Sequence, residues 1–101
     1  MSNFAILLNK LGEIEFINKK VLDELNFKEK EVIGKYFIEV EWFSLEKKKE
    51  LKEAMDRAIK GISVRFETEI FSKNKEFSFP VWLSLTPVND EKGNLRHIVV
   101  E

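Results

Sequence analysis

The chain has 101 residues, which is enough for one domain with a single hydrophobic core. Its 17 Lys and Arg residues nearly balance its 18 Asp and Glu residues, so the net charge of −1 excludes the electrostatic footprint of a nucleic-acid or anionic-membrane partner. The absence of cysteine excludes disulfides, thiolate metal sites and cysteine nucleophiles, and it favours an intracellular protein, which we place in the cytoplasm.

Two short apolar segments at the start of the chain predict a β-hairpin. Residues 4–9 are mostly apolar, and residues 13–18 alternate between apolar and polar side chains. This alternation places Ile14 and Phe16 on the same face of the second strand. Gly12 is expected to close the turn between the two strands.

Two short helices are predicted next, over residues 19–27 and 28–34. Asn18 suits the N-cap of the first helix, where its side-chain oxygen would accept a hydrogen bond from a backbone N–H of the first turn. Asn26 tolerates the left-handed conformation in which helices often end. Gly34 is expected to end the second helix and to direct the aromatic segment that follows it back across the sheet.

A long amphipathic helix is predicted over residues 44–61. Ser44 suits its N-cap, and Gly61 suits the position just after its C-terminus. Its apolar residues recur at intervals of three and four, which gives one face that packs on the domain: Leu51, Ala54, Met55, Ala58 and Ile59.

Three strands are predicted to close the chain, over residues 63–71, 76–88 and 95–101. Proline fits poorly in a central strand, so Pro80 is expected at a bulge or strand start and Pro87 at a strand end. The resulting order of two strands, a block of helices and three strands predicts an α+β fold. One antiparallel sheet with helices packed on one face satisfies this order.

Several segments, in this order, resemble those of the PAS sensory domains. Asn18 and the short helix that leads to Leu25-Asn26-Phe27 resemble the family's N-x-a-x-x-x-L-G-Y segment, and KEKEVIGKYF resembles its s-x-e-E-l-i-G-k segment. RAIKG, VRFETEIF, the turn SKNK and FPVWLSLTPVNDEKGNLRHIVV resemble the family's three closing strands, although Asn26 and Lys75 replace two customary glycines. The resemblance covers residues 4–100. It implies a five-stranded antiparallel sheet in the order 2-1-5-4-3 that cups the helices and often a small ligand.

The resemblance implies a sensory function rather than a catalytic one. We expect residues 1–101 to form a single PAS domain, excised from a larger signalling protein such as a sensor histidine kinase of a two-component system. The domain would bind a small apolar ligand in its core and relay a conformational change to an output domain. The alternative is a ligand-free module that serves only dimerisation or another protein–protein interaction. No catalytic Ser/His/Asp arrangement or phosphate-binding glycine loop is visible in the sequence, so an enzyme is not expected.

The predicted ligand cavity is lined by the apolar residues expected to face the helices from the sheet, together with residues of the aromatic segment and of the long helix. These candidates are Ile6, Leu8, Phe37, Val40, Trp42, Met55, Ile59, Phe66, Val81, Leu83, Leu85 and Ile98. A cavity with such walls favours an apolar ligand.

The identity of a cofactor stays open, but two of the family's cofactors are not expected here. Some PAS domains hold haem through a His on the long helix, whereas the one His of this chain is His97 in the last strand, where it is expected to point outward. Flavin adducts need a cysteine, and the chain has none. No metal site is predicted, because Met55 on the apolar face of the long helix is best explained as core packing.

A homodimer interface is predicted on the outer face of the sheet. Strand alternation places Ala5, Leu7, Trp82 and Val99 there. An exposed apolar patch of this kind usually marks a contact surface. The alternative is that a flanking segment of a longer chain covers it.

Overall fold

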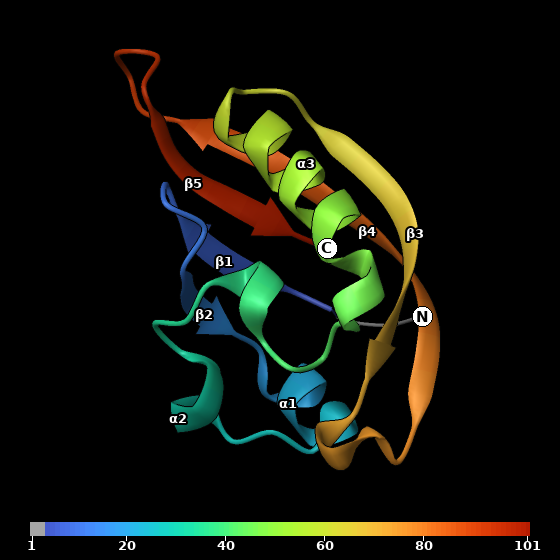
Figure 1. The fold of residues 1–101 in the computed structure, drawn as a ribbon. Coiled ribbons are helices and arrows are strands. Elements are labelled where there is room, and N and C mark those ends of the chain that lie inside the picture. Colours follow the sequence, from blue (N-terminus) through green and yellow to red (C-terminus); the bar gives the residue numbers. More distant parts are fainter. Residues whose placement is uncertain (1–3) are drawn as a thin grey trace.

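The computed structural model describes residues 4–101 and shows two layers, a five-stranded antiparallel sheet and a layer of helices on one of its faces (Figure 1). The elements follow one another in the order β1 (Ile6–Asn9), β2 (Ile14–Ile17), α1 (Lys19–Leu25), α2 (Glu29–Val32), a 3-10 turn (Phe37–Glu39), a second 3-10 turn (Leu45–Lys47), α3 (Lys48–Ile59), β3 (Val64–Phe71), a third 3-10 turn (Lys73–Lys75), β4 (Ser78–Asn89) and β5 (Leu95–Val100). The strand order is β2-β1-β5-β4-β3. The predicted α+β fold and strand order are therefore confirmed.

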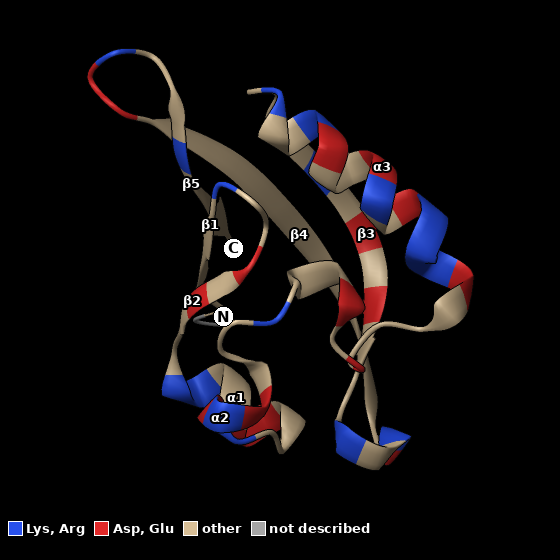
Figure 2. Ribbon diagram, turned by 60° about the vertical axis from the view of Figure 1, so that its left-hand side comes forward, with Lys and Arg blue, Asp and Glu red and all other residues tan. Residues whose placement is uncertain are grey.

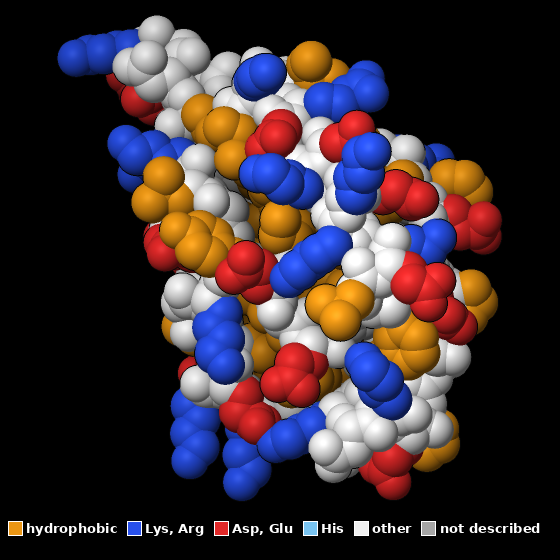
Figure 3. Space-filling view, in the orientation of Figure 1, with side chains coloured by type: hydrophobic (Ala, Val, Ile, Leu, Met, Phe, Trp, Pro, Cys, Tyr) orange, Lys and Arg blue, Asp and Glu red, His pale blue; other side chains and the backbone are white. Residues whose placement is uncertain are grey.

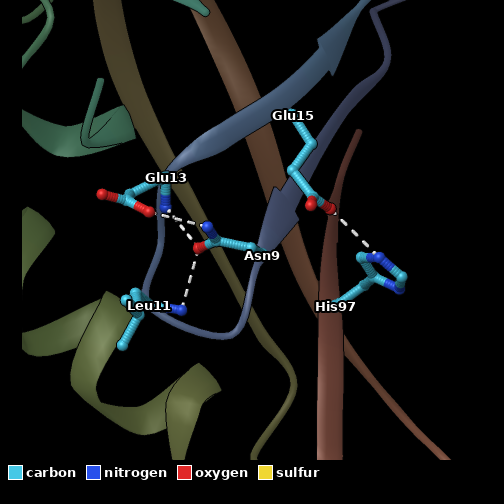
Figure 4. A network of polar contacts seen from close by, with 5 residues as sticks. All are labelled: Asn9, Leu11, Glu13, Glu15 and His97. Carbon is cyan, nitrogen blue, oxygen red and sulfur yellow. Dashed lines mark hydrogen bonds and ion pairs between the residues drawn. The ribbon is translucent and has the colours of Figure 1, made fainter. Parts of the chain in front are cut away.

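The turn between β1 and β2 is built around Asn9. Its side-chain oxygen accepts hydrogen bonds from the backbone N–H groups of Leu11 and Glu13, each at 2.9 Å, and its amide nitrogen donates to a carboxylate oxygen of Glu13 at 2.7 Å (Figure 4). Gly12 adopts a φ of 89°, which other residues rarely adopt. Asn9 and Gly12 together fix the length of this turn and close the hairpin.

The second strand carries a β-bulge that the sequence did not predict. Leu7 pairs with Phe16 and Leu8 pairs with Ile14, so Glu15 is an additional residue opposite β1. The bulge shifts the alternation by one position. Ile14 is 1% exposed on the helix side, whereas Phe16 is 54% exposed on the other side. The prediction that Ile14 and Phe16 share a face is therefore wrong.

The ends of the first two helices agree with the predicted turn residues, but one cap differs. Asn26 follows α1 with φ 63° and ψ 35°, the left-handed conformation that was predicted, and Gly34 follows α2 with a φ of 84°. Asn18 precedes α1 as predicted, but its side-chain oxygen accepts a hydrogen bond from the backbone N–H of Ala5 at 3.2 Å instead of capping the helix. Asn18 therefore ties the start of α1 to the start of β1.

The segment after α2 runs beside β2 before it enters the core. The Gly34 N–H donates to the Ile14 carbonyl at 2.8 Å, and the Ile14 N–H donates to the Lys35 carbonyl at 2.9 Å. Gly34 thus directs the chain first along the free edge of β2, where Tyr36 bridges to Glu13. The aromatic segment then crosses the sheet as predicted, since the Trp42 carbonyl is bonded to the end of β3 at the opposite edge. The 3-10 turn that begins at Phe37 then carries the aromatic segment under α3.

The long helix begins later than predicted. A 3-10 turn precedes it, and α3 itself starts at Lys48, so the Ser44 side chain caps neither element. The helix ends at Ile59, and Gly61 follows with a φ of 91°. Charged residues of both signs follow one another along its outer side (Figure 2), while its apolar side lies on β4 and its neighbours (Figure 1).

The longest described strand, β4, pairs with β3 from Ser78 to Leu85 and with β5 from Leu85 to Asn89. Ser84 exchanges two backbone hydrogen bonds with Glu101, so its backbone N–H points to the β5 side of the strand. Every second residue of a strand points its backbone groups to the same side. The backbone nitrogen of Pro80, four residues earlier, therefore also points to the β5 side. No described strand pairs with β4 there. Pro87 faces the β3 side, where the pairing with β3 has already ended at Leu85. Both prolines therefore lie inside β4 without the loss of a sheet hydrogen bond, which corrects their predicted places at a bulge, strand start or strand end.

One hydrophobic core lies between the sheet and the helices. It draws side chains from every strand, from α1, α2 and α3 and from the aromatic segment. On the helix-covered surface, by contrast, hydrophobic side chains are interspersed with charged ones of both signs (Figure 3). None of the helices within residues 4–101 has the length and apolar character needed to cross a membrane.

Candidate functional site

Most residues of the predicted cavity lie together in the core. The side chains that are at most 5% exposed and belong to one cluster are Ile6, Leu8, Phe37, Val40, Trp42, Met55, Leu83, Leu85 and Ile98. They come from three strands, from α3 and from the aromatic segment, so both layers contribute to the same interior. Phe66 and Val81 are partly buried and pack against this cluster.

Ile59 does not belong to this interior. It is 37% exposed and lines a surface groove of about 210 Å³ with Leu11 and Tyr36. Ile59 is the last residue of α3, although Ala58 directly before it is fully buried. At about 100° per residue Ile59 lies at the border of the buried side of the helix, so its helical spacing alone did not show whether a neighbour covers it.

Trp42 lies at the centre of an aromatic cluster in this interior. Its ring centroid is 5.7 Å from that of Phe27, 5.9 Å from that of Phe37 and 6.4 Å from that of Phe43. The rings meet edge to face or tilted, the arrangements that aromatic quadrupoles favour. The Trp42 carbonyl accepts a hydrogen bond from the Phe71 N–H at 2.8 Å, which anchors the aromatic segment to the end of β3.

Two buried side-chain polar atoms of the described residues have no hydrogen-bond partner, Nε1 of Trp42 and Oγ1 of Thr68. Trp42 is 1% exposed and Thr68 is 7% exposed. Ser72 is equally buried, but its hydroxyl accepts from the Phe77 N–H at 2.9 Å. Sequence reasoning missed Thr68, although its place between inward-facing Phe66 and Ile70 in β3 is the signal that would have found it.

A family model described as PAS domain matches residues 2–101. The chain is a member of the PAS domain family. No curated protein matches this PAS domain.

Solved structures with the same fold share little sequence with this PAS domain. A variant of the PAS-B domain of Cycle from Drosophila melanogaster, with bound glycerol, has a TM-score of 0.81 at 16% identity and covers 97% of this chain and 95% of its own. The light-state dimer of the fungal blue-light photoreceptor Vivid has a TM-score of 0.76 at 19% identity, with coverages of 99% and 77%. A domain of a putative light and redox sensing histidine kinase from Haloarcula marismortui has a TM-score of 0.74 at 16% identity, with coverages of 96% and 84%. At these identities the likeness shows the PAS fold.

The one histidine of the PAS domain lies on the outer face of the sheet. The Nε2 atom of His97 in β5 is 3.0 Å from a carboxylate oxygen of Glu15, the bulge residue of β2 (Figure 4). This places His97 outward, as predicted, so it cannot ligate haem in the interior. Among the described residues no group of three or more His, Asp or Glu side chains is arranged to hold a metal ion.

The outer face of the sheet carries a row of side chains in register across four strands. Leu7 of β1 pairs with Phe16 on one side and with Val99 on the other, and Val99 pairs with Thr86 of β4. We call Phe16, Leu7 and Val99 the outer apolar row. Trp82 is 58% exposed on the same face.

Of the predicted interface residues, Leu7 and Val99 belong to this row, whereas Trp82 lies four residues before Thr86 on β4, opposite Glu67. Leu7 and Val99 are half-buried, and Ala5 lies half-buried just before β1. The guanidinium carbon of Arg65 lies 5.1 Å from the centroid of the Trp82 ring. Phe16 was missed because the bulge at Glu15, which turns it outward, has no clear sequence signal.

An ion pair joins the helix layer to the turn between β3 and β4. Lys73 donates a hydrogen bond to one carboxylate oxygen of Glu31 in α2, and the Lys28 N–H donates to the other at 2.8 Å. These two hydrogen bonds hold the pKa of Glu31 below its usual value, and the bond from Lys73 is the larger cause. Both side chains line a surface groove of about 490 Å³ whose wall includes Phe27.

Proposed function

We propose that this PAS domain is the sensory domain of a signal-transduction protein, such as a sensor histidine kinase of a two-component system. In this proposal a small, mainly apolar molecule binds in the interior between α3 and the sheet. Its unequal affinity for two conformations of the domain shifts their equilibrium, and an output domain of the parent protein responds. Family membership and the fold shared with a histidine kinase domain support the sensory part.

The observation that carries the ligand-binding part is the pair of buried polar atoms without partners. Buried polar groups in native proteins are almost always hydrogen-bonded, and each exception calls for an explanation. Trp42 Nε1 and Thr68 Oγ1 lie in an interior whose other buried side chains are apolar, apart from the paired Ser72. A core built only for packing would have an apolar residue at each of these positions, whereas a binding site needs such groups to orient its ligand.

The test is to purify the protein without unfolding it, denature it and analyse the released small molecules by mass spectrometry. We expect one compound at a constant ratio to protein, also after expression in a second host. Protein that releases nothing, and whose thermal midpoint does not respond to a library of small neutral compounds, would contradict ligand binding.

The second candidate is an interaction module that dimerises through the outer face of the sheet. The outer apolar row and, on the same face, the exposed Trp82 favour it, since exposed apolar groups that gather on one surface usually mark a contact site. Such a face fits a second copy of this chain in a homodimer. The same face also fits a segment that flanks the domain in a longer parent protein.

Sedimentation velocity of the wild-type protein and of Trp82→Glu tests this candidate. We expect a dimer for the wild type and a monomer for the variant, because the exchange removes the largest exposed apolar side chain of this face and adds a charge that is costly to desolvate in a contact. Leu45→Glu is the matched control, since Leu45 is 84% exposed on the helix layer and its replacement should leave the dimer intact. A wild-type protein that stays monomeric at high concentration would contradict the proposed homodimer.

The proposal includes no catalytic activity, no nucleic-acid partner and no membrane contact of this domain, and it places the protein in the cytoplasm. The nearly balanced charge and its even spread over the helix layer support the absence of polyanionic partners (Figure 2).

A further inference from the structure

We propose that the ligand of this PAS domain is a neutral, mainly apolar carbonyl compound whose oxygen accepts a hydrogen bond from Trp42 Nε1–H. This inference rests on the proposed ligand-binding function and names the chemical class of the ligand. It assigns Trp42 as the residue that selects for that class. Thr68 acts as the second polar contact.

The need for an acceptor follows from the chemistry of the two unpaired groups. An indole N–H can only donate, so whatever satisfies Trp42 must accept. The Thr68 hydroxyl can also donate, because its rotation places the proton toward whichever acceptor is present. A carbonyl oxygen can accept from the indole N–H, whereas a hydrocarbon ligand would leave both buried groups without a partner.

The need for a neutral ligand follows from the side chains that are buried with Trp42. Among the described residues the buried polar or charged side chains are Thr68 and Ser72, and no Lys, Arg, Asp or Glu is among them. Ser72 is already occupied by its hydrogen bonds to the backbone of Phe77. A carboxylate or ammonium group on the ligand would therefore be buried without a counter-charge, which strongly disfavours binding.

A short path joins this site to the surface. Phe27 packs edge to face on Trp42 and also lines the groove that contains Glu31 and Lys73. One aromatic ring therefore separates the Trp42 indole from a groove that is open to solvent. Displacement of the Phe27 ring would open a route from this groove to the indole.

The experiment compares two probes that differ only at the acceptor atom, cyclohexanone and methylenecyclohexane. In the second probe a CH₂ group replaces the carbonyl oxygen, so shape and apolar area are nearly conserved. The ¹⁵N-labelled protein, freed of bound small molecules by unfolding and refolding, is titrated with each probe while the two tryptophan indole N–H signals are followed by NMR. Trp82, which is exposed on the outer face, is the internal control.

We expect cyclohexanone to bind about tenfold more tightly than methylenecyclohexane, the effect of one buried hydrogen bond. The Trp42 indole proton should shift downfield with cyclohexanone only, and the Trp82 signal should stay in place. Trp42→Phe should abolish the preference for cyclohexanone, and Thr68→Val should reduce it. If the Trp42 variant does not fold, the wild-type titration decides.

The outcomes separate this inference from the function on which it rests. Equal affinity for the two probes, or binding of cyclohexanone without a shift of the Trp42 signal, would overturn the carbonyl contact while ligand binding itself stands. Absence of binding by either probe, with the indole proton of Trp42 exchanging magnetisation with water, would show that internal water satisfies this group. That result would overturn both the inference and the ligand-binding function.

Discussion

The two faces of the sheet are made by the same strands, yet they differ in almost every property. Toward the helices, Leu8, Leu83 and Ile98 are at most 1% exposed and belong to one packed core. On the other face, the neighbouring residues Leu7 and Val99 are only half-buried, although they are equally apolar. Alternation along the strands separates the two sets, so a shift of one residue in a strand exchanges them.

The difference shows which part of the sequence serves stability and which part is available for recognition. The inner face gains its free energy within the chain, because its core residues, such as Leu8, Leu83 and Ile98, are covered by other parts of the same chain. The outer apolar row has no such cover among the described residues. Its apolar area contributes less to folding and is free to contribute to association.

The largest effect that tests this comparison is expected from truncation of neighbouring leucines on β1. Leu8→Ala should lower the free energy of unfolding by about 2–5 kcal/mol, because it leaves a cavity in a packed core. Leu7→Ala, the matched control one residue away, should lower it by less than about 1 kcal/mol. Urea denaturation of the two variants measures both values. Similar losses for both would show that the outer face is as tightly packed as the inner one.

A smaller effect of opposite sign is expected for a pair of threonines. Thr68→Val should raise the free energy of unfolding of the ligand-free protein by about 1 kcal/mol, because the buried hydroxyl has no partner and valine has nearly the same shape. Thr86→Val on the exposed outer face is the control and should change it by less than about 0.5 kcal/mol. A loss of stability in Thr68→Val would mean that the hydroxyl is paired inside the free protein.

The smallest effect concerns neither face but the Glu31–Lys73 pair between α2 and the β3–β4 turn. The pKa of Glu31 is lowered in the folded protein, so the pair stabilises the fold above the ordinary carboxyl pKa of 4.5 and loses this contribution as the pH falls through the folded-state pKa. Lys73→Met removes the first cause of the shift. The urea midpoint of this variant should therefore fall less on acidification than that of the wild type. Parallel acid profiles would show that the pair contributes nothing measurable.

Much of the inner face could be predicted from the sequence, because its rules are local. Alternation alone places Leu8, Leu83 and Ile98 on one side of their strands, and positive φ at Asn26 and Gly34 follows from residue type. Family resemblance supplied the strand order, which local patterns do not contain.

The features that escaped prediction depend on contacts between distant parts of the chain. The bulge at Glu15 is defined only by the pairing of β2 with β1, and the outward turn of Phe16 follows from it. The unpaired Trp42 nitrogen depends on how four rings pack, and the exposure of Ile59, next to the fully buried Ala58, depends on which neighbours cover the border of the buried side of α3. Neither residue type nor spacing carries this information.

The stagger of β4 has a consequence for how copies of this domain can meet. The start of β4 has no described strand on its β5 side, and the end of β4 has none on its β3 side. The backbone nitrogen of Pro80 points to the first of these open edges, and that of Pro87 points to the second. A strand of another molecule that paired there would find no backbone N–H donor at Pro80 or Pro87, so one hydrogen bond of the new strand pair would be missing. Growth of the sheet by edge-to-edge addition, the route to fibrils, is thereby discouraged at both places. The side chains of the outer face are then the surface through which we propose that copies associate.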